Sequence, residues 1–196
     1  AEAADRSRSG GLRAVLLGAP GSGKATQAEF LAASLGVPAI STGAMLRDAV
    51  AHGSALGSKV EGIMACGGLV DDALMAEVVR ERLGRPDAAG GFLLDGYPRT
   101  TGQAAMLDSI LAEREEQLDA VLLLEVPEAV LVERAVARKR ADDGEDVVRE
   151  RLRVYREKTE PLVEHYERRN LLRRVDGNRT MREVTAASLK MLGRQA

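Results

Sequence analysis

A short glycine-rich loop between an apolar strand and a helix constrains the fold more than any other feature of the chain. Residues 18–26 read GAPGSGKAT, follow an apolar run at 15–17, and lead into a helical stretch at 24–35. Two glycines five residues apart, the second followed by Lys24, match the phosphate-loop pattern, in which backbone N–H groups converge on a polyphosphate. A plain strand-to-helix turn rarely carries glycine and lysine at this spacing, so the loop predicts polyphosphate binding.

The same alternation of strand and helix recurs and predicts an α/β fold. Apolar runs appear again at residues 92–94 and 121–124, and each is followed by amphipathic sequence long enough for a helix. Continuous apolar runs are typical of strands that are covered on both faces. We therefore expect a doubly wound parallel sheet of about five strands in one domain, residues 12–196, and we interpret residues 1–11 as a disordered leader.

Two segments interrupt this alternation. Residues 41–83 contain three helical stretches, which is too much helix for one crossover, and we expect about 41–70 to form an inserted helical flap. Asp71 or Asp72 is expected to cap the third stretch. The second interruption, at about 138–147, is rich in arginine and then in acidic residues, and it predicts a small lid between two helices.

Composition excludes several classes of protein. The 28 basic and 30 acidic residues give a net charge of −2, and aromatic residues make up only 3%, so extended nucleic-acid binding is not expected. No apolar run approaches the roughly 20 residues of a membrane span. The single cysteine, Cys66, cannot form an internal disulfide, which favours a reducing compartment. We expect a cytoplasmic protein with neither nucleic-acid nor membrane partners.

Ala25 departs from the usual phosphate loop, which has Ser or Thr after the lysine to hold Mg²⁺. Alanine has no ligand atom, so the metal must be held by phosphates, water and a carboxylate elsewhere. Asp95 ends the apolar run at 92–94, at the sheet edge where doubly wound folds bind ligands, and is the best candidate to hold Mg²⁺ through water. A helix or turn cap, next to Gly96 and Pro98, is the alternative role for Asp95. The departure favours small nucleotide kinases over GTPases and motor ATPases.

Four motifs in register resemble those of the adenylate kinase family. They are GAPGSGKATQ at 18–27, ISTGAMLR at 40–47, GFLLDGYPR at 91–99 followed by Gln103, and the arginine-rich stretch at 134–143. The resemblance extends over essentially everything from Leu12 onward, and the short lid without cysteines is similar to the zinc-free form. It implies reversible phosphoryl transfer from Mg-ATP to AMP, giving two ADP, by a monomeric enzyme whose flap binds the monophosphate.

The resemblance also implies which residues meet each nucleotide. On the ATP side they are loop residues and two arginines: Gly21, Ser22, Gly23, Lys24, Ala25, Thr26, Arg134 and Arg138. On the AMP side they are Thr42, Gly43, Arg47, Leu69, Val70, Gly96, Arg99, Gln103, Arg140 and Arg151. In-line transfer between two polyanions needs cations that neutralise the transferred group, and the expected catalytic residues are Lys24, Arg99, Arg138, Arg140 and Arg151.

Two alternatives stay open. Thr42 and Gln103 stand where adenylate kinases contact the AMP base, whereas kinases for UMP and CMP commonly carry Ala and Asn there; another nucleoside monophosphate kinase is the nearest alternative. The second is an adenine-nucleotide-binding module with weakened turnover. Four positions depart from the family pattern, Ala25, Ala44, Gly102 and Arg179, and the first, second and fourth of them keep this alternative open.

Overall fold

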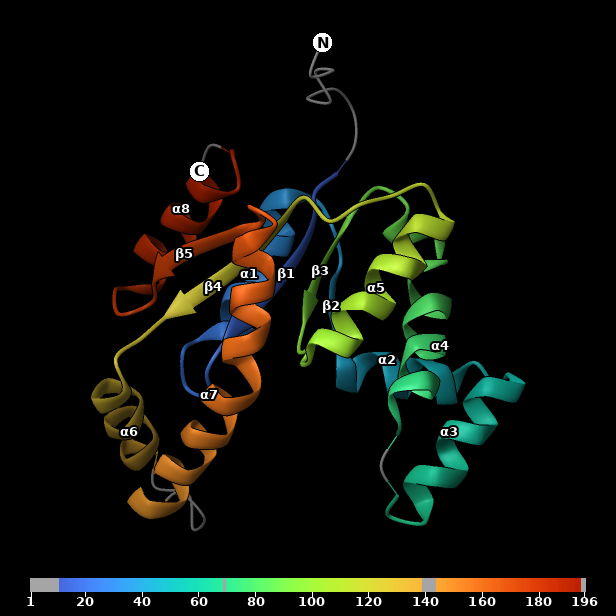
Figure 1. The fold of residues 1–196 in the computed structure, drawn as a ribbon, viewed down its shortest axis with the longest axis horizontal. Helices are drawn as coiled ribbons and strands as arrows, with labels where there is room; N and C mark the ends of the chain where they lie inside the picture. The colour runs from blue at the N-terminus through green and yellow to red at the C-terminus, as the bar shows by residue number, and fades with distance from the viewer. Residues whose placement is uncertain (1–10, 69, 139–143, 195–196) are drawn as a thin grey trace.

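The computed structural model describes residues 11–68, 70–138 and 144–194 of the chain. A five-stranded sheet lies at its centre, with the strand order β2-β3-β1-β4-β5 and every neighbouring pair parallel (Figure 1). The strands are β1 (Arg13–Gly18), β2 (Ala39–Ser41), β3 (Phe92–Asp95), β4 (Ala120–Glu125) and β5 (Leu172–Asp176). The predicted α/β class and parallel sheet of about five strands are confirmed.

The central strands are buried on both faces. Leu16 in β1 pairs with Asp95 in β3 and with Leu122 in β4, and Leu16 itself is fully buried. Because all strands run in the same direction, their carboxyl ends meet at one edge of the sheet. Gly18 and Asp95 end neighbouring strands there, so the phosphate-loop motif and the predicted metal-binding carboxylate lie side by side.

Two layers of helices cover the sheet. On one face, α1 (Lys24–Leu35) and α8 (Met181–Met191) bury residues such as Leu31 and Leu189 against the sheet. On the other face the covering helices are α4 (Asp72–Leu83), α5 (Thr101–Glu113) and α7 (Glu145–Arg168). This is the doubly wound arrangement that the apolar strands predict.

The three helical stretches predicted between residues 41 and 83 are present. They are α2 (Thr42–Ala51), α3 (Ala55–Ala65) and α4, and a short 3₁₀ turn, η1 (Pro86–Ala88), follows them. The side chains of Ser41 and Ser54 cap α2 and α3. Asp71 caps α4, because its Oδ1 accepts a hydrogen bond from Leu74 N at 2.7 Å. In Figure 1, α3 lies well away from the sheet.

Two helices flank the second interruption. The first, α6 (Glu128–Ala137), packs against α7 through buried residues that include Leu131 and Leu152. Helix α7 begins at Glu145, so residues 145–147 of the predicted lid are helical. Residues 139–143 of the predicted lid lie outside the described residues. Within the described ranges, no helix is both long enough and apolar enough to cross a membrane.

Candidate active site

The loop between β1 and α1 has the geometry of an anion-binding loop. Gly21 and Gly23 have φ values of 86° and 85°, in the left-handed region that favours glycine. At Gly18 a Cβ would lie 2.6 Å from Ser22 Oγ, so a side chain does not fit there. No side chain caps the start of α1, which leaves the first N–H groups of this 12-residue helix to face the loop. Uncapped N–H groups and the positive end of the helix dipole favour a phosphate at this point.

Lys24 and Asp95 meet at the carboxyl edge of the sheet. Nζ of Lys24 lies 2.9 Å from Oδ1 of Asp95, and the two side chains are 26% and 14% exposed. The ion pair holds the ammonium group beside the loop. It also keeps the one carboxylate that ends β3 close to the place where phosphates would lie.

The acidic groups at this edge suit a metal that arrives with its substrate rather than one held by the protein alone. Among the residues described, no group of three or more His, Cys, Asp or Glu is placed to hold a metal ion. Ala25 is exposed at the start of α1 and has no ligand atom. Because Mg²⁺ in phosphate sites keeps several waters and binds one or two carboxylates plus substrate phosphates, Asp95 fits this role.

A hydrogen-bonded group surrounds the turn that follows β3. The carbonyl oxygen of Gly96 accepts one hydrogen bond from Thr42 Oγ1 at 3.0 Å and another from Arg99 Nε at 2.8 Å. Gly96 has a φ of 87°, and a Cβ there would lie 3.1 Å from Thr42 Oγ1. The start of α2 and the turn after β3 are thereby joined, which brings together three residues predicted to bind the monophosphate.

Gln103 belongs to the same group and is held from two sides. Its Oε1 accepts a hydrogen bond from Arg99 N at 2.8 Å, and its Nε2 donates to Asp72 Oδ1 at 2.9 Å. Two further predictions for this side concern Val70 and the pair Gly43 and Arg47. Val70 is half-buried and packs against the larger core cluster. A guanidinium nitrogen of Arg47 lies 3.1 Å from the position that a Cβ of Gly43 would occupy. Leu69, also predicted for this side, lies outside the described residues.

Two arginines of α6 and its C-cap approach the phosphate loop. Arg134 Nη1 donates a hydrogen bond to the carbonyl oxygen of Gly21 at 3.1 Å. Arg138 Nη2 lies 3.7 Å from the position that a Cβ of Gly21 would occupy. The contact described for Arg134 is thus with the loop backbone, whereas the resemblance implies that this side chain lies over the ATP adenine. Arg140 lies outside the described residues.

One cavity, here called the loop cavity, connects the phosphate loop with α7. Its volume is about 490 Å³, and Gly18 and Pro20 of the loop contribute to its wall. The charged residues described along it are four basic and one acidic: Lys24, Arg99, Arg151, Lys158 and Glu150. Three of the predicted catalytic residues, from α1, from the turn after β3 and from α7, therefore share one cavity.

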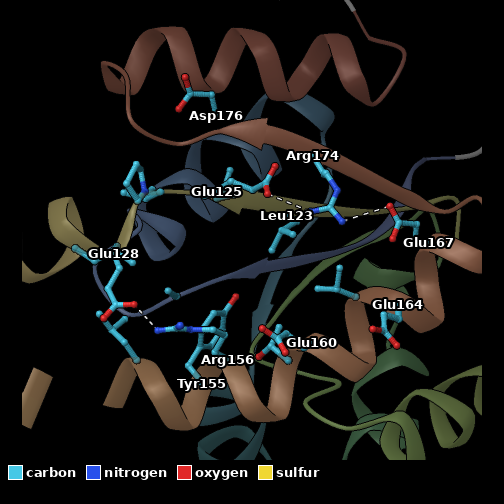
Figure 2. Close-up of a pocket in the computed structure, with 18 residues that line it drawn as sticks. Leu123, Glu125, Glu128, Tyr155, Arg156, Glu160, Glu164, Glu167, Arg174 and Asp176 are labelled. Carbon is cyan, nitrogen blue, oxygen red and sulfur yellow. Dashed lines mark hydrogen bonds and ion pairs between the residues drawn. The ribbon is translucent and has the colours of Figure 1, made fainter. Parts of the chain in front are cut away.

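A larger cavity of about 950 Å³, here called the acidic groove, lies between α6, α7 and the ends of β4 and β5 (Figure 2). Two arginines in it are paired: Arg174 with Glu125 at 3.1 Å and Glu167 at 3.3 Å, and Arg156 with Glu128. The six described carboxylates along it belong to Glu125, Glu128, Glu160, Glu164, Glu167 and Asp176. Of the predicted nucleotide-binding residues that the structure describes, none lines this groove, and the charge of the groove would repel a polyphosphate.

Two residues near the site were missed by the sequence analysis. The first is Gln27, which is only 1% exposed. Its Nε2 donates a hydrogen bond to Met181 O at 3.1 Å, and its Oε1 accepts one from Thr185 Oγ1 at 2.9 Å. These two hydrogen bonds connect α1 to α8. Lys158 adds a cation to the loop cavity. The position of Gln27 at the end of the loop motif was a signal for the first, whereas nothing in the sequence distinguishes Lys158 from the other charges of α7.

Comparisons with known proteins agree with this geometry. The family model for adenylate kinase matches residues 16–171. The chain is 49% identical over 183 residues to the adenylate kinase of Nocardia farcinica. It is 48% identical over 183 residues to the adenylate kinase of Mycobacterium tuberculosis. Each alignment covers 93% of this chain and 100% of the relative. Adenylate kinase 1 of a Synechocystis strain is 48% identical over 178 residues, 91% of this chain and 95% of the relative. The chain belongs to the adenylate kinase family.

Proposed function

We propose that the loop cavity is the place where this adenylate kinase transfers a phosphoryl group from Mg-ATP to AMP, giving two ADP. One observation carries the proposal: Lys24, Arg99 and Arg151, from three separate elements, line a single cavity beside the phosphate loop. Transfer between two polyanions requires several cations around the moving group, since charge spreads over its equatorial oxygens.

The phosphate loop binds the ATP phosphates. The backbone N–H groups from Gly21 to Thr26, apart from that of Ser22, which donates to Ala19 O at 3.0 Å, donate to phosphate oxygens. Lys24 places its ammonium group against the outer phosphates. Arg134 and Arg138 approach from α6. Asp95 would hold Mg²⁺ through water, and the ion would supply positive charge that offsets the negative charge of the ATP phosphates.

AMP binds next to the phosphate loop, and three residues of its set, Gly96, Arg99 and Arg151, line the loop cavity. Arg99 and Arg47 hold its phosphate, and Thr42 and Gln103 contact the adenine. The remaining members of this set are Gly43, Leu69, Val70, Gly96, Arg140 and Arg151. Residues 41–70 act as the monophosphate-binding flap, and the segment at about 138–147 acts as the lid, carrying Arg138 and Arg140 toward the transferred group.

The reaction needs no general base, because the attacking AMP phosphate oxygen is already anionic. Catalysis consists of aligning the two nucleotides and neutralising the charge on the transferred group. Water must be excluded, because an exposed γ-phosphoryl group would otherwise be hydrolysed. Closure of flap and lid supplies that exclusion and is coupled to binding of both nucleotides. The enzyme acts as a cytoplasmic monomer on ATP, AMP and ADP.

An assay of ADP formation with Mg-ATP and each of AMP, CMP, UMP and GMP tests the proposal. AMP should be the best acceptor, and an equal or better rate with a pyrimidine nucleotide would overturn the assignment of the base. Binding of an analogue with two adenosines joined by a polyphosphate separates the remaining alternative. If this analogue binds tightly but no ADP forms from ATP and AMP, the protein is a binding module rather than an enzyme.

A further inference from the structure

We infer that Asp72 is a specificity-determining positioning residue that fixes the orientation of the Gln103 side-chain amide, so that this amide matches adenine and not a 6-oxopurine. The inference rests on the proposed function, in which Gln103 contacts the AMP base. Asp72 is the first residue of α4, and Gln103 lies in the first turn of α5, 31 positions further along the chain.

The amide of Gln103 has two contacts of opposite polarity. Its Oε1 accepts a hydrogen bond from the backbone N–H of Arg99 at 2.8 Å, and its Nε2 donates to Asp72 Oδ1 at 2.9 Å. Turning the amide by half a revolution would place its NH₂ group against the Arg99 N–H and its oxygen against the carboxylate. Both contacts would then join groups of like polarity, so Asp72 and the Arg99 backbone permit one orientation only.

The remaining hydrogen-bonding capacity of the amide has a fixed pattern as a result. An amide has two N–H donors and two oxygen lone pairs, and the two contacts use one of each. What remains is one acceptor beside one donor. Adenine presents the complementary pair, the N6 amino donor beside a ring-nitrogen acceptor. Hypoxanthine presents the reverse, the O6 acceptor beside the N1–H donor, and would need the turned amide.

The charge on Asp72 gives this residue the larger part in the selection. A carboxylate only accepts hydrogen bonds and makes charge-assisted ones, so it resists an oxygen placed against it more strongly than a neutral group would. The negative charge of Asp72 also affects Tyr97: burial, together with this charge, raises the pKa of Tyr97 to about 12. The Tyr97 hydroxyl donates a hydrogen bond to the carbonyl oxygen of Gln103 at 3.4 Å, so a group that responds to the charge of Asp72 also contacts Gln103.

Asp71 provides a matched control, because it precedes Asp72 and has a different role. Its Oδ1 accepts a hydrogen bond from Leu74 N and caps α4. Asp71→Ala should therefore lower the melting temperature without changing the preference between bases. A merely structural role for Asp72 predicts that Asp72→Ala behaves in the same way.

The test compares AMP with inosine monophosphate as acceptor in the full-length enzyme with Mg-ATP. In Asp72→Ala, the ratio of kcat/KM for AMP to that for inosine monophosphate should fall about tenfold, chiefly through a higher KM for AMP. The kcat at saturating AMP should stay within about threefold of wild type, and the KM for ATP should not change. Asp72→Asn keeps an acceptor oxygen of the same reach and should retain part of the preference, which also covers the case in which the alanine variant folds poorly.

Gln103→Ala distinguishes failure of this inference from failure of the proposed function. If Gln103→Ala removes the preference for AMP but Asp72→Ala and Asp72→Asn keep it, Gln103 reads the base and the role of Asp72 is wrong. If Gln103→Ala keeps the preference, the base is not read at this position, and both the role of Asp72 and that part of the proposed function are wrong. A similar loss of preference in Asp71→Ala and Asp72→Ala would mean that α4 stability, and not the orientation of the amide, is responsible.

Discussion

The loop cavity and the acidic groove lie on either side of α7, and Tyr155 and Thr159 line both. Four basic residues and one acidic residue are described along the first, against two basic and six acidic along the second. The groove is the larger of the two, yet its charge opposes a polyphosphate. Cavity size alone therefore does not identify the nucleotide site, and the net charge of −2 conceals two local fields of opposite sign.

The periodicity of α7 separates these two fields. Residues such as Arg151, Lys158 and Leu162 recur at helical spacing and line the loop cavity, whereas Arg156, Glu160 and others on the next stripe line the groove. Charged residues that are close together in the sequence of α7 therefore line different cavities. Variants on the two stripes can test whether that separation is functional.

Replacing Lys24 by methionine should have the largest effect on the loop cavity. The variant removes an ammonium group from the phosphate loop while keeping most of the volume of the side chain, and kcat/KM for the transfer should fall about 1,000-fold, as for loss of a charge contact in the transition state. Circular dichroism should show the fold intact. Turnover close to that of wild type would remove the loop cavity from the mechanism.

Arg99→Ala should have the next largest effect, about a 100-fold fall in kcat, because a cation facing the transferred group is lost. Calorimetry should find ATP binding nearly intact, since the phosphate loop is not altered. Arg80→Ala is the control: Arg80 forms an exposed ion pair with Glu113 on the helical surface, and removing such a pair should leave turnover unchanged. Equal losses in the two variants would contradict the assignment of Arg99.

Charge reversal on the two stripes of α7 should give a smaller and unequal effect. Lys158→Glu places a carboxylate in the loop cavity and should lower kcat/KM about fivefold, mainly through KM for the nucleotides. Arg156→Glu makes the same change of charge in the acidic groove, where Arg156 pairs with Glu128, and should leave kcat/KM within about twofold of wild type. Steady-state kinetics at low and high salt would measure both. A comparable loss in Arg156→Glu would extend the site into the groove.

The sequence predicts the centre of the fold well, because local signals agree there. The helix predicted at 24–35 has those bounds in the structure, with glycines in left-handed conformation at both ends, Gly23 and Gly36. Asp95 ends β3 as predicted, since the apolar run stops at that residue. Each of these features depends on neighbouring residues alone.

The edges of the sheet are harder to predict from sequence. The last strand, β5, reads LRRVD, and no continuous apolar run marks it, because it lies at the sheet edge with Arg174 turned toward carboxylates of the acidic groove. The second strand, β2, has only three residues. Edge strands need less apolar sequence than central ones, so their pattern is weak.

Residue roles that depend on distant packing could not be predicted. The sequence allows either Asp71 or Asp72 to cap α4, and only the packing of α4 against α5 places Asp72 beside Gln103. The same holds for Gln27, whose buried amide meets α8 across more than 150 residues. Short-range patterns predict elements and loop motifs, whereas contacts between helices decide which of two adjacent polar residues enters a site.

Tyr155→Phe should have the smallest effect and tests the wall that the two cavities share. Burial raises the pKa of Tyr155 to about 12, against a small opposing influence of its hydrogen bond with Thr159. Because this pKa lies above that of an unfolded chain, the contribution of Tyr155 to stability is complete below about pH 10 and is lost as the pH rises from about 10 to about 12.

At neutral pH the variant should keep its turnover and change the free energy of unfolding by about 1 kcal/mol or less. Above about pH 10 its stability should fall less steeply than that of wild type, although Tyr97 and Tyr166, whose pKa values are also raised by burial, keep part of the decline. Denaturant unfolding at neutral and alkaline pH measures the difference, and parallel curves for the two proteins would mean that Tyr155 is solvated and that the wall between the cavities is open to water.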